Sequence, residues 1–253
     1  MPKFTKISFE TLLVLVVLIA NLYVAFAPAN SLVHEWYPSD DAFYYFKTAQ
    51  NITEGHGITF DGIGRTNGFH PLWMLINIPI FALARYDVIL PLRLLVMVLA
   101  ALSAGTAVLL YRLSGTFFSK PVAALVALFW AFSPRVQSIT TKLGMEAGIS
   151  AFCIALLLYL LVRYEQRSGQ SEQEDRKGIL LLGLAAILTL FSRLDNIFLV
   201  LMVGLWLLFR RPNIRHQVMA DILLITLAVF GSYLLRFGFS DRYYWNSTSA
   251  FYM

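Results

Sequence analysis

The stretch Y-P-S-D-D-A-F-Y-Y-F-K-T-A-Q-N-I-T-E-G-H-G, residues 37–57, follows the first strongly apolar segment and contains two adjacent acids, Asp40 and Asp41. Ser39 is a residue type that caps helices, and acids in a first helical turn complement the helix dipole. Apolar residues then recur at helical spacing, which predicts an amphipathic helix over about 40–53 lying in a membrane interface. The two acids either cap this helix or handle a proton or a cation, and the stretch alone leaves both roles open.

The predicted helix has two unlike faces. Its apolar face comprises Ala42, Tyr45, Phe46, Ala49 and Ile52. The opposite face carries Asp41, Tyr44, Thr48 and Asn51. Polar groups on one side of an interfacial helix face water or a substrate, so we expect Tyr44 to contact substrate beside the acids.

Composition fixes the class of protein. The chain has 253 residues, of which 58% are hydrophobic and 14% charged, and its mean hydropathy is +0.66. Soluble domains carry about 25% charged residues, so this is an integral membrane protein. The net charge of +5 does not indicate nucleic-acid binding, because the basic residues cluster in short loops between apolar runs. A single cysteine, Cys153, excludes a disulfide framework.

Eight apolar runs lie along the chain. They cover about 9–27, 71–84, 88–111, 121–134, 146–163, 178–192, 196–210 and 218–237. Lys3 and Lys6 precede the first run and place the N-terminus in the cytoplasm. If all eight runs crossed the membrane, the basic loops 112–120, 163–177 and 210–215 would face outside, against the positive-inside rule.

One run must therefore not cross. Run 71–84 is too short for a span of about 20 residues. It contains Asn77 and Pro79, and Trp73 suits a membrane interface. We predict an all-α membrane protein with about seven transmembrane helices and two juxtamembrane helices, the latter in an outer loop over 28–86. Residues 1–253 form a single module without a separate soluble domain, with 135–145, 192–196 and the C-terminal tail outside.

Two connections remain to be interpreted. The segment S-R-L-D-N, residues 192–196, is either a tight outer turn or a place where Arg193 and Asp195 dip toward an outer cavity. The inner segment 163–177 has mixed charge and is predicted to be a mobile linker.

The loop E-G-H-G-I-T-F-D-G-I-G-R-T-N-G-F-H-P, residues 54–71, packs five glycines around a short strand-like segment. A loop of this kind brings backbone close to another group. It also contributes polar side chains on the same outer side as the aspartates, namely His56, Arg65, Asn67 and His70.

Glu146 begins a span on the outer side. It is either a helix N-terminal acid at the water boundary or a further carboxylate facing the same cavity as Asp40 and Asp41. Carboxylates on different helices can act as general bases or hold a divalent cation such as Mg²⁺ or Mn²⁺. Spacing alone does not choose between these roles.

Three motifs together resemble a known family. D-D-A-F-Y-Y, then A-x-N-I-x-x-G-x-G-x-x-F-D-G, then T-N-G-F-H-P-L-W resemble the first outer loop of prokaryotic membrane glycosyltransferases of the C-type (GT-C) superfamily, which includes protein mannosyltransferases and arabinofuranosyltransferases. L-G-M-E, residues 143–146, resembles a second acidic motif of the arabinofuranosyltransferase-like branch. The resemblance covers about residues 9–210.

The resemblance implies a hexosyl- or pentosyltransferase of the prokaryotic plasma (inner) membrane. It would move a sugar from a polyprenyl-phosphate donor to an acceptor on the periplasmic or extracellular face, with inversion. By position, Asp40 would be the general base, and Asp41 and Glu146 would position it or bind a cation. A departing lipid phosphate needs nearby positive charge. The outer-side candidates for this charge are Arg65, Arg85, Lys142, Arg193 and Arg242. The alternative role of each is an interfacial contact to lipid headgroups.

A second hypothesis is non-enzymatic. Members of the superfamily usually continue into further spans, whereas this sequence ends at D-R-Y-Y-W-N-S-T-S-A-F-Y-M. A shortened module of this kind would be an accessory subunit that works with other membrane subunits in a larger complex. A transporter is less well supported, because paired broken helices in matching halves are missing.

Overall fold

The computed structural model describes residues 8–84, 87–167, 171–210, 219 and 223. Contacts divide the chain into two units, residues 1–196 and 197–253. The first unit contains the helices α1 (Phe9–Ala25), α2 (Ala29–Ser31), η1 (Leu32–Trp36), α3 (Asp40–Thr53), α4 (Pro71–Leu83), α5 (Leu90–Ser114), α6 (Lys120–Phe132), α7 (Pro134–Gln137), η2 (Ser138–Lys142), α8 (Ala147–Arg167), α9 (Glu172–Ser192) and η3 (Leu194–Asn196). In the second unit the described helix is α10 (Ile197–Arg210).

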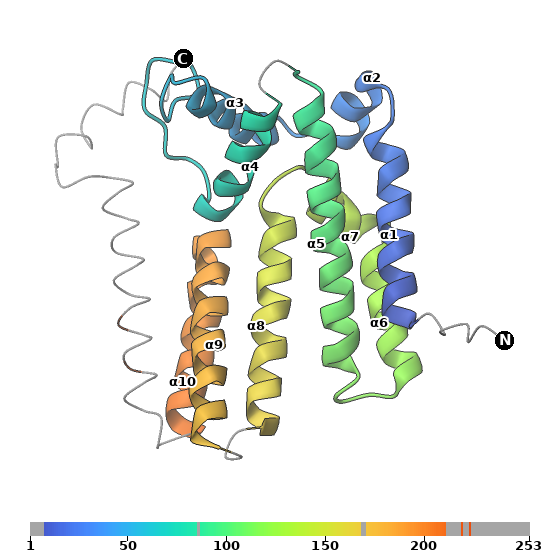
Figure 1. Cartoon of the computed structure of the whole chain (residues 1–253), viewed down its shortest axis with the longest axis vertical. Helices are drawn as coiled ribbons and strands as arrows, with labels where there is room; N and C mark the ends of the chain where they lie inside the picture. Colours follow the sequence, from blue (N-terminus) through green and yellow to red (C-terminus); the bar gives the residue numbers. More distant parts are fainter. Residues whose placement is uncertain (1–7, 85–86, 168–170, 211–218, 220–222, 224–253) are drawn as a thin grey trace. The chain divides into compact units, whose positions relative to one another are not determined.

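Helix α5 is the centre of the first unit and packs against α1, α6 and α8 (Figure 1). Small side chains make these contacts close, because Ala104 and Ala107 of α5 are buried against Ala127 and Ala131 of α6. On the side of α8, a Cβ at Gly105 would lie 2.9 Å from the ring of Phe152. Small residues at such interfaces let apolar helices approach without a polar driving force.

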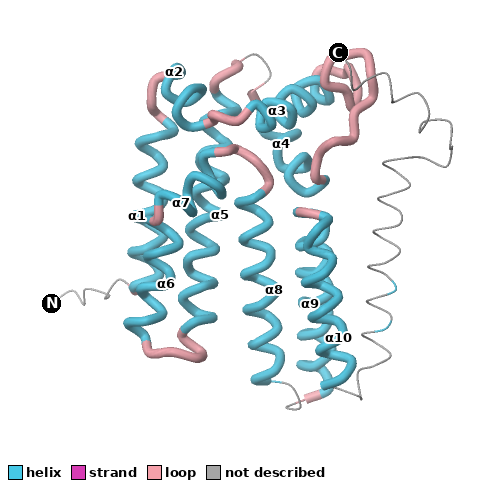
Figure 2. Tube along the Cα trace, turned by 180° about the vertical axis from the view of Figure 1, so that it is seen from behind, coloured by secondary structure: helices cyan, strands magenta, loops and turns pink. Residues whose placement is uncertain are grey.

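Helices α3 and α4 pack against each other at one end of the first unit, and the α5–α6 connection, the end of α8 and the start of α9 lie at the opposite end (Figures 1 and 2). The sequence prediction for the first of these helices is confirmed, since α3 spans Asp40–Thr53. Ser39 occupies the N-cap position, but its side chain makes no cap hydrogen bond. Instead, the Asp41 amide donates to Oδ1 of Asp40 at 3.0 Å.

The glycine-rich loop after α3 folds back on that helix. Gly55, Gly57 and Gly62 have φ between +75° and +87°, a region that other residues rarely adopt. The strand-like segment forms one isolated antiparallel bridge, between Thr59 and Arg65. No named strand is present in the described ranges, in keeping with the all-α prediction.

The described part of the chain has two helices, α5 and α8, that are long and apolar enough to cross a membrane. The number rises to four if two bent pairs each make one span, α1 with α2–η1 (111°) and α6 with α7–η2 (49°). Together with the composition, these helices identify a membrane protein. Seven spans stay a prediction, and run 218–237 with Arg85 and Arg242 falls outside the described residues, apart from the isolated helical positions 219 and 223.

Two predictions about side chains are wrong. Thr48 and Asn51, predicted on the polar face of the helix, are 0% and 3% exposed and are therefore buried. The Asn51 amide donates to the carbonyls of Thr59 and Phe60, both at 3.0 Å. Trp73, expected at the lipid boundary, is fully buried inside the protein.

One prediction about a connection is also wrong. Helix α8 continues to Arg167 and α9 begins at Glu172, so most of the expected linker 163–177 is helical. Residues 135–145, predicted to lie outside, are largely helical, because α7 and η2 run from Pro134 to Lys142, and their sidedness stays a prediction.

Candidate active site

A cavity lies where α3 and the start of α8 meet, at the α4 end of the unit. It has a volume of about 350 Å³. Its walls are formed by Asp41, Tyr44, Tyr45, Gly68, His70, Met145 and Glu146. The structure thus brings Asp41 and Glu146, which are 105 positions apart in the sequence, to one cavity. Asp40 lies in the same helical turn but is not among the lining residues.

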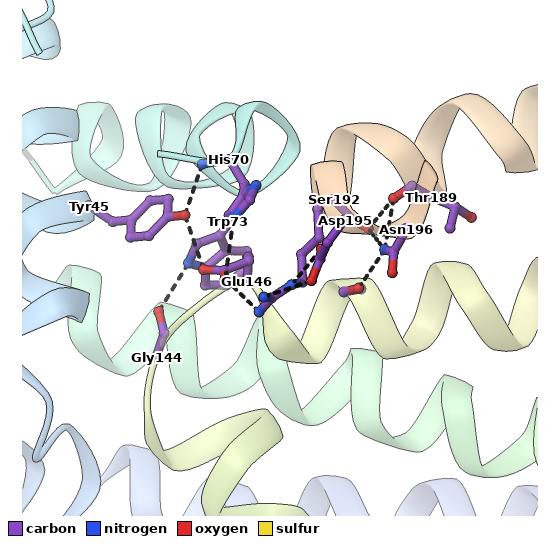
Figure 3. A network of polar contacts seen from close by, with 11 residues as sticks. Tyr45, His70, Trp73, Gly144, Glu146, Thr189, Ser192, Asp195 and Asn196 are labelled. Atoms are coloured by element: carbon purple, nitrogen blue, oxygen red, sulfur yellow. Dashed lines mark hydrogen bonds and ion pairs between the residues drawn. The ribbon is translucent and has the colours of Figure 1, made fainter. Parts of the chain in front are cut away.

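Glu146 is the buried acid of this cavity. It is 3% exposed, and both of its carboxylate oxygens have partners (Figure 3). The Tyr45 hydroxyl donates to Oε2 at 3.0 Å, and Nη1 of Arg193 donates to Oε1 at 3.0 Å. Nε2 of His70 lies 3.7 Å from the same Oε1. A buried charge needs partners of this kind, since an unpaired one is costly to remove from water.

Tyr45 connects the two sequence motifs. Its hydroxyl donates to Glu146 and accepts from the backbone N–H of His70 at 2.9 Å. Burial, together with the neighbouring carboxylate, raises the pKa of Tyr45 well above its ordinary value. The phenol therefore stays a hydrogen-bond donor throughout the neutral range.

Gly144 explains the L-G-M-E motif in structural terms. Its φ is +66°, and a Cβ there would lie 2.7 Å from the ring of Tyr37 and 3.2 Å from that of Phe46. Its carbonyl accepts from the Trp73 indole N–H at 3.0 Å. A glycine is thus needed for both backbone conformation and close approach, and the turn that it makes delivers Glu146 to the cavity.

Arg193 lies between two carboxylates. Its Nε and Nη2 each donate to Asp195 at 3.1 Å, and Nη1 reaches Glu146. The hydrogen bonds from Arg193 lower the pKa of Asp195. Of the two interpretations of S-R-L-D-N, each is therefore partly right. The segment is a short 3-10 turn with Asp195 exposed, while Arg193 points to the acid of the cavity.

A hydrogen-bonded cluster fixes that turn against α8 and α9. The Asn196 amide donates to Ser150 Oγ at 2.9 Å and to the carbonyl of Thr189 at 3.1 Å. Ser192 Oγ donates to the same carbonyl at 2.7 Å (Figure 3). These contacts hold the turn from which the Arg193 side chain extends.

Residues 70–235 match the family described as dolichyl-phosphate-mannose-protein mannosyltransferase. The chain belongs to this family. No curated protein and no solved structure matches the chain.

Membership of the mannosyltransferase family makes the chain a membrane glycosyltransferase of the GT-C type. The matched range begins at His70 and includes Glu146, Arg193 and Asp195, whereas Asp40 and Asp41 precede it. The buried acid Glu146 and its partner Arg193 therefore lie within the matched range, whereas Tyr45, the other buried partner, precedes it.

Other residues predicted to bind substrate are dispersed. His56 is exposed, with Nδ1 3.6 Å from Glu54. Arg65 is exposed at the isolated bridge, and Asn67 is exposed one residue before Gly68. Nζ of Lys142 lies 5.3 Å from the ring centroid of Trp36. None of these four lines the cavity, in contrast to Tyr44 and His70.

The described residues do not form a set of ligands for a cation. Within the described residues, no group of three or more His, Cys, Asp and Glu side chains is arranged to hold a metal ion. Asp40, Asp41 and Glu146 were the predicted ligands of a cation. The carboxylate of Glu146 already accepts hydrogen bonds from Tyr45 and Arg193. The residues present do not fit a protein-built Mg²⁺ or Mn²⁺ site, so no chemical step is assigned to a cation, and the ion stays a prediction.

Three residues of the network escaped the sequence analysis. Tyr45 was assigned only to the apolar face of its helix, although buried tyrosines usually direct the hydroxyl to a polar partner. Trp73 and Asn196 give no local signal of their contacts, because their partners Gly144 and Ser150 are remote in sequence.

Proposed function

We propose that the chain transfers a sugar from a polyprenyl-phosphate donor to an acceptor hydroxyl at the cavity lined by Asp41 and Glu146. The observation that supports this most is the pairing of an exposed carboxylate with a buried, fully bonded one on a single cavity. A transferase of this kind needs a base near the acceptor and fixed charges that hold the geometry. The family supplies the reaction class, and the cavity supplies groups suited to it.

The base is a carboxylate of the Asp40–Asp41 pair. It accepts the proton of the acceptor hydroxyl while that oxygen bonds to the anomeric carbon. The bond from the anomeric carbon to the phosphate oxygen breaks, and its electron pair leaves with the lipid phosphate. A single displacement of this kind inverts the anomeric carbon.

Two observations favour different members of the pair. The resemblance assigns the base to Asp40, whereas the geometry favours Asp41, which lines the cavity. Oδ1 of Asp40 is already the acceptor for the Asp41 amide. Separate substitutions of the two aspartates distinguish these assignments.

Glu146 has a positioning role. Because Tyr45, Arg193 and His70 occupy its oxygens, it holds those side chains around the cavity. The charge of Arg193 is already balanced by Glu146 and Asp195. Arg65 and Lys142 form no ion pair with a carboxylate of the described chain, but neither lines the cavity, so compensation of the departing phosphate is not assigned to a residue.

The test measures sugar transfer in membranes, with polyprenyl-phosphate sugars as donors. The rate is normalised to the amount of folded protein. The proteins compared are the wild type, Asp40→Asn, Asp41→Asn and Glu146→Gln. Loss of a general base lowers the rate about 10²–10⁴-fold, so one aspartate variant should show this loss while the other retains more activity. Asp61→Asn is the matched control, since Asp61 is an exposed acid that accepts from the Ile63 and Gly64 amides away from the cavity.

Retention of activity by both aspartate variants contradicts the assigned base. If the wild type transfers no polyprenyl-phosphate sugar, while its removal dissociates a larger membrane complex, the accessory-subunit hypothesis replaces the enzyme.

A further inference from the structure

A second cavity, of about 320 Å³, lies between the end of α8 and the start of α9. This is the end of the unit opposite α3 and α4 (Figures 1 and 2). Its lining residues are Tyr159, Leu160, Arg163, Tyr164, Arg167, Asp175, Lys177, Gly178 and Leu181. No residue of the candidate active site takes part in it.

The second cavity carries an excess of positive charge. Arg163 and Arg167 are four residues apart and so share one face of α8, and α9 contributes Lys177. Asp175 is the one acid among the lining residues, which leaves a net charge of +2. Within the described chain, no ion pair with a carboxylate holds Arg167 or Lys177.

Aromatic side chains shape the walls. The Arg163 guanidinium carbon lies 5.8 Å from the ring centroid of Tyr159, a cation–π contact that orients its donors. The ring of Tyr164 packs on α9 where Gly178 has no side chain, since a Cβ there would lie 2.6 Å from it. Deeper in the helices, Leu160 and Leu181 add apolar wall beside the cations.

We propose that this cavity binds the phosphate of an anionic phospholipid, with an acyl chain along the two leucines. The cations lie at the polar end of an apolar helix, where they match a lipid headgroup. The tyrosines beside them match the glycerol region, and the leucines below match an acyl chain. A free phosphate would use the cations but not the apolar wall. The proposal is independent of the transferase assignment.

The experiment is a lipid titration of the full chain in detergent, read by native mass spectrometry. The probes are phosphatidylglycerol and phosphatidylcholine with the same acyl chains. We expect at least about tenfold tighter binding of phosphatidylglycerol, and a roughly tenfold loss in Arg167→Gln and in Lys177→Gln, since each removes one charged contact. Arg167→Lys keeps the charge and should bind like the wild type.

Lys120→Gln is the matched control, because it removes one exposed cation near the same end but outside the cavity. A photoactivatable phosphatidylglycerol should label wild-type peptides from 159–167 and 177–181, which tests the site without any substitution. Equal binding of the two lipids, an equal loss in Lys120→Gln, or displacement of the lipid by millimolar inorganic phosphate would each overturn the proposal.

Discussion

The hydroxyl of Tyr45 donates to the Glu146 carboxylate at 3.0 Å, although the two residues are 101 positions apart. This bond joins the helix that carries the aspartates to the start of α8, and it places a neutral donor against a buried charge.

Tyr45→Phe should destabilise the protein while keeping its shape. The change removes the donor to Glu146 and the acceptor of the His70 amide, and a buried polar group left without its partner costs about 1–3 kcal/mol. Thermal unfolding in detergent measures the loss. Tyr23→Phe is the control, because Tyr23 is 84% exposed on α1 and should leave the midpoint unchanged. Equal midpoints for the wild type and Tyr45→Phe would show that the hydroxyl contributes nothing.

Glu146→Gln and Arg193→Gln should be coupled. Either substitution alone leaves the other charge without its partner, and the double variant removes that mismatch. The interaction energy should be roughly 1–3 kcal/mol, below the value for a fully buried pair because Arg193 is 38% exposed and solvent screens its charge. A double-mutant cycle on unfolding free energies gives this number. Additive effects within about 0.5 kcal/mol would contradict a direct pair.

Gly144→Ala should be much more harmful than Gly62→Ala. Both glycines have positive φ, but a Cβ at Gly144 collides with Tyr37, whereas at Gly62 nothing lies within 4 Å. Backbone strain alone costs about 1–3 kcal/mol, and the collision adds to it at Gly144. The measurement is the yield of folded protein and its unfolding midpoint. Similar losses for both variants would mean that strain, and not close approach, explains the glycine.

Cysteine labelling tests the proposed sidedness. Ile63 is 90% exposed in the loop after α3, and Ser171 precedes α9 at the other end of the unit. In intact cells a membrane-impermeant maleimide should label Ile63→Cys, and Ser171→Cys only after permeabilisation. Native Cys153 is buried and gives a low background. Labelling of Ser171→Cys in intact cells would reverse the proposed orientation.

Local signals in the sequence predicted α3 over about 40–53, because the acids and the helical spacing agree there, while Ser39 makes no cap hydrogen bond. They failed for Thr48 and Asn51, since burial by other parts of the chain is not visible in the pattern of one helix. Charge composition similarly suggested a linker where α8 and α9 extend beyond their apolar cores.

The site was predicted unevenly for a related reason. Topology and resemblance placed Asp41 and Glu146 on one side of the membrane, and both line one cavity. The contacts that orient them depend on side-chain directions of Tyr45, Trp73 and Arg193, which spacing does not specify. Buried long-range hydrogen bonds are set by tertiary packing, so a single sequence gives them no local signature.

The ion pair between Glu146 and Arg193 has a consequence for biosynthesis. A growing chain delivers α8, with its acid, 47 residues before the guanidinium that neutralises it. During that interval Tyr45 and His70 are the partners already made for the acid, so its set of contacts is completed only when residue 193 has been added.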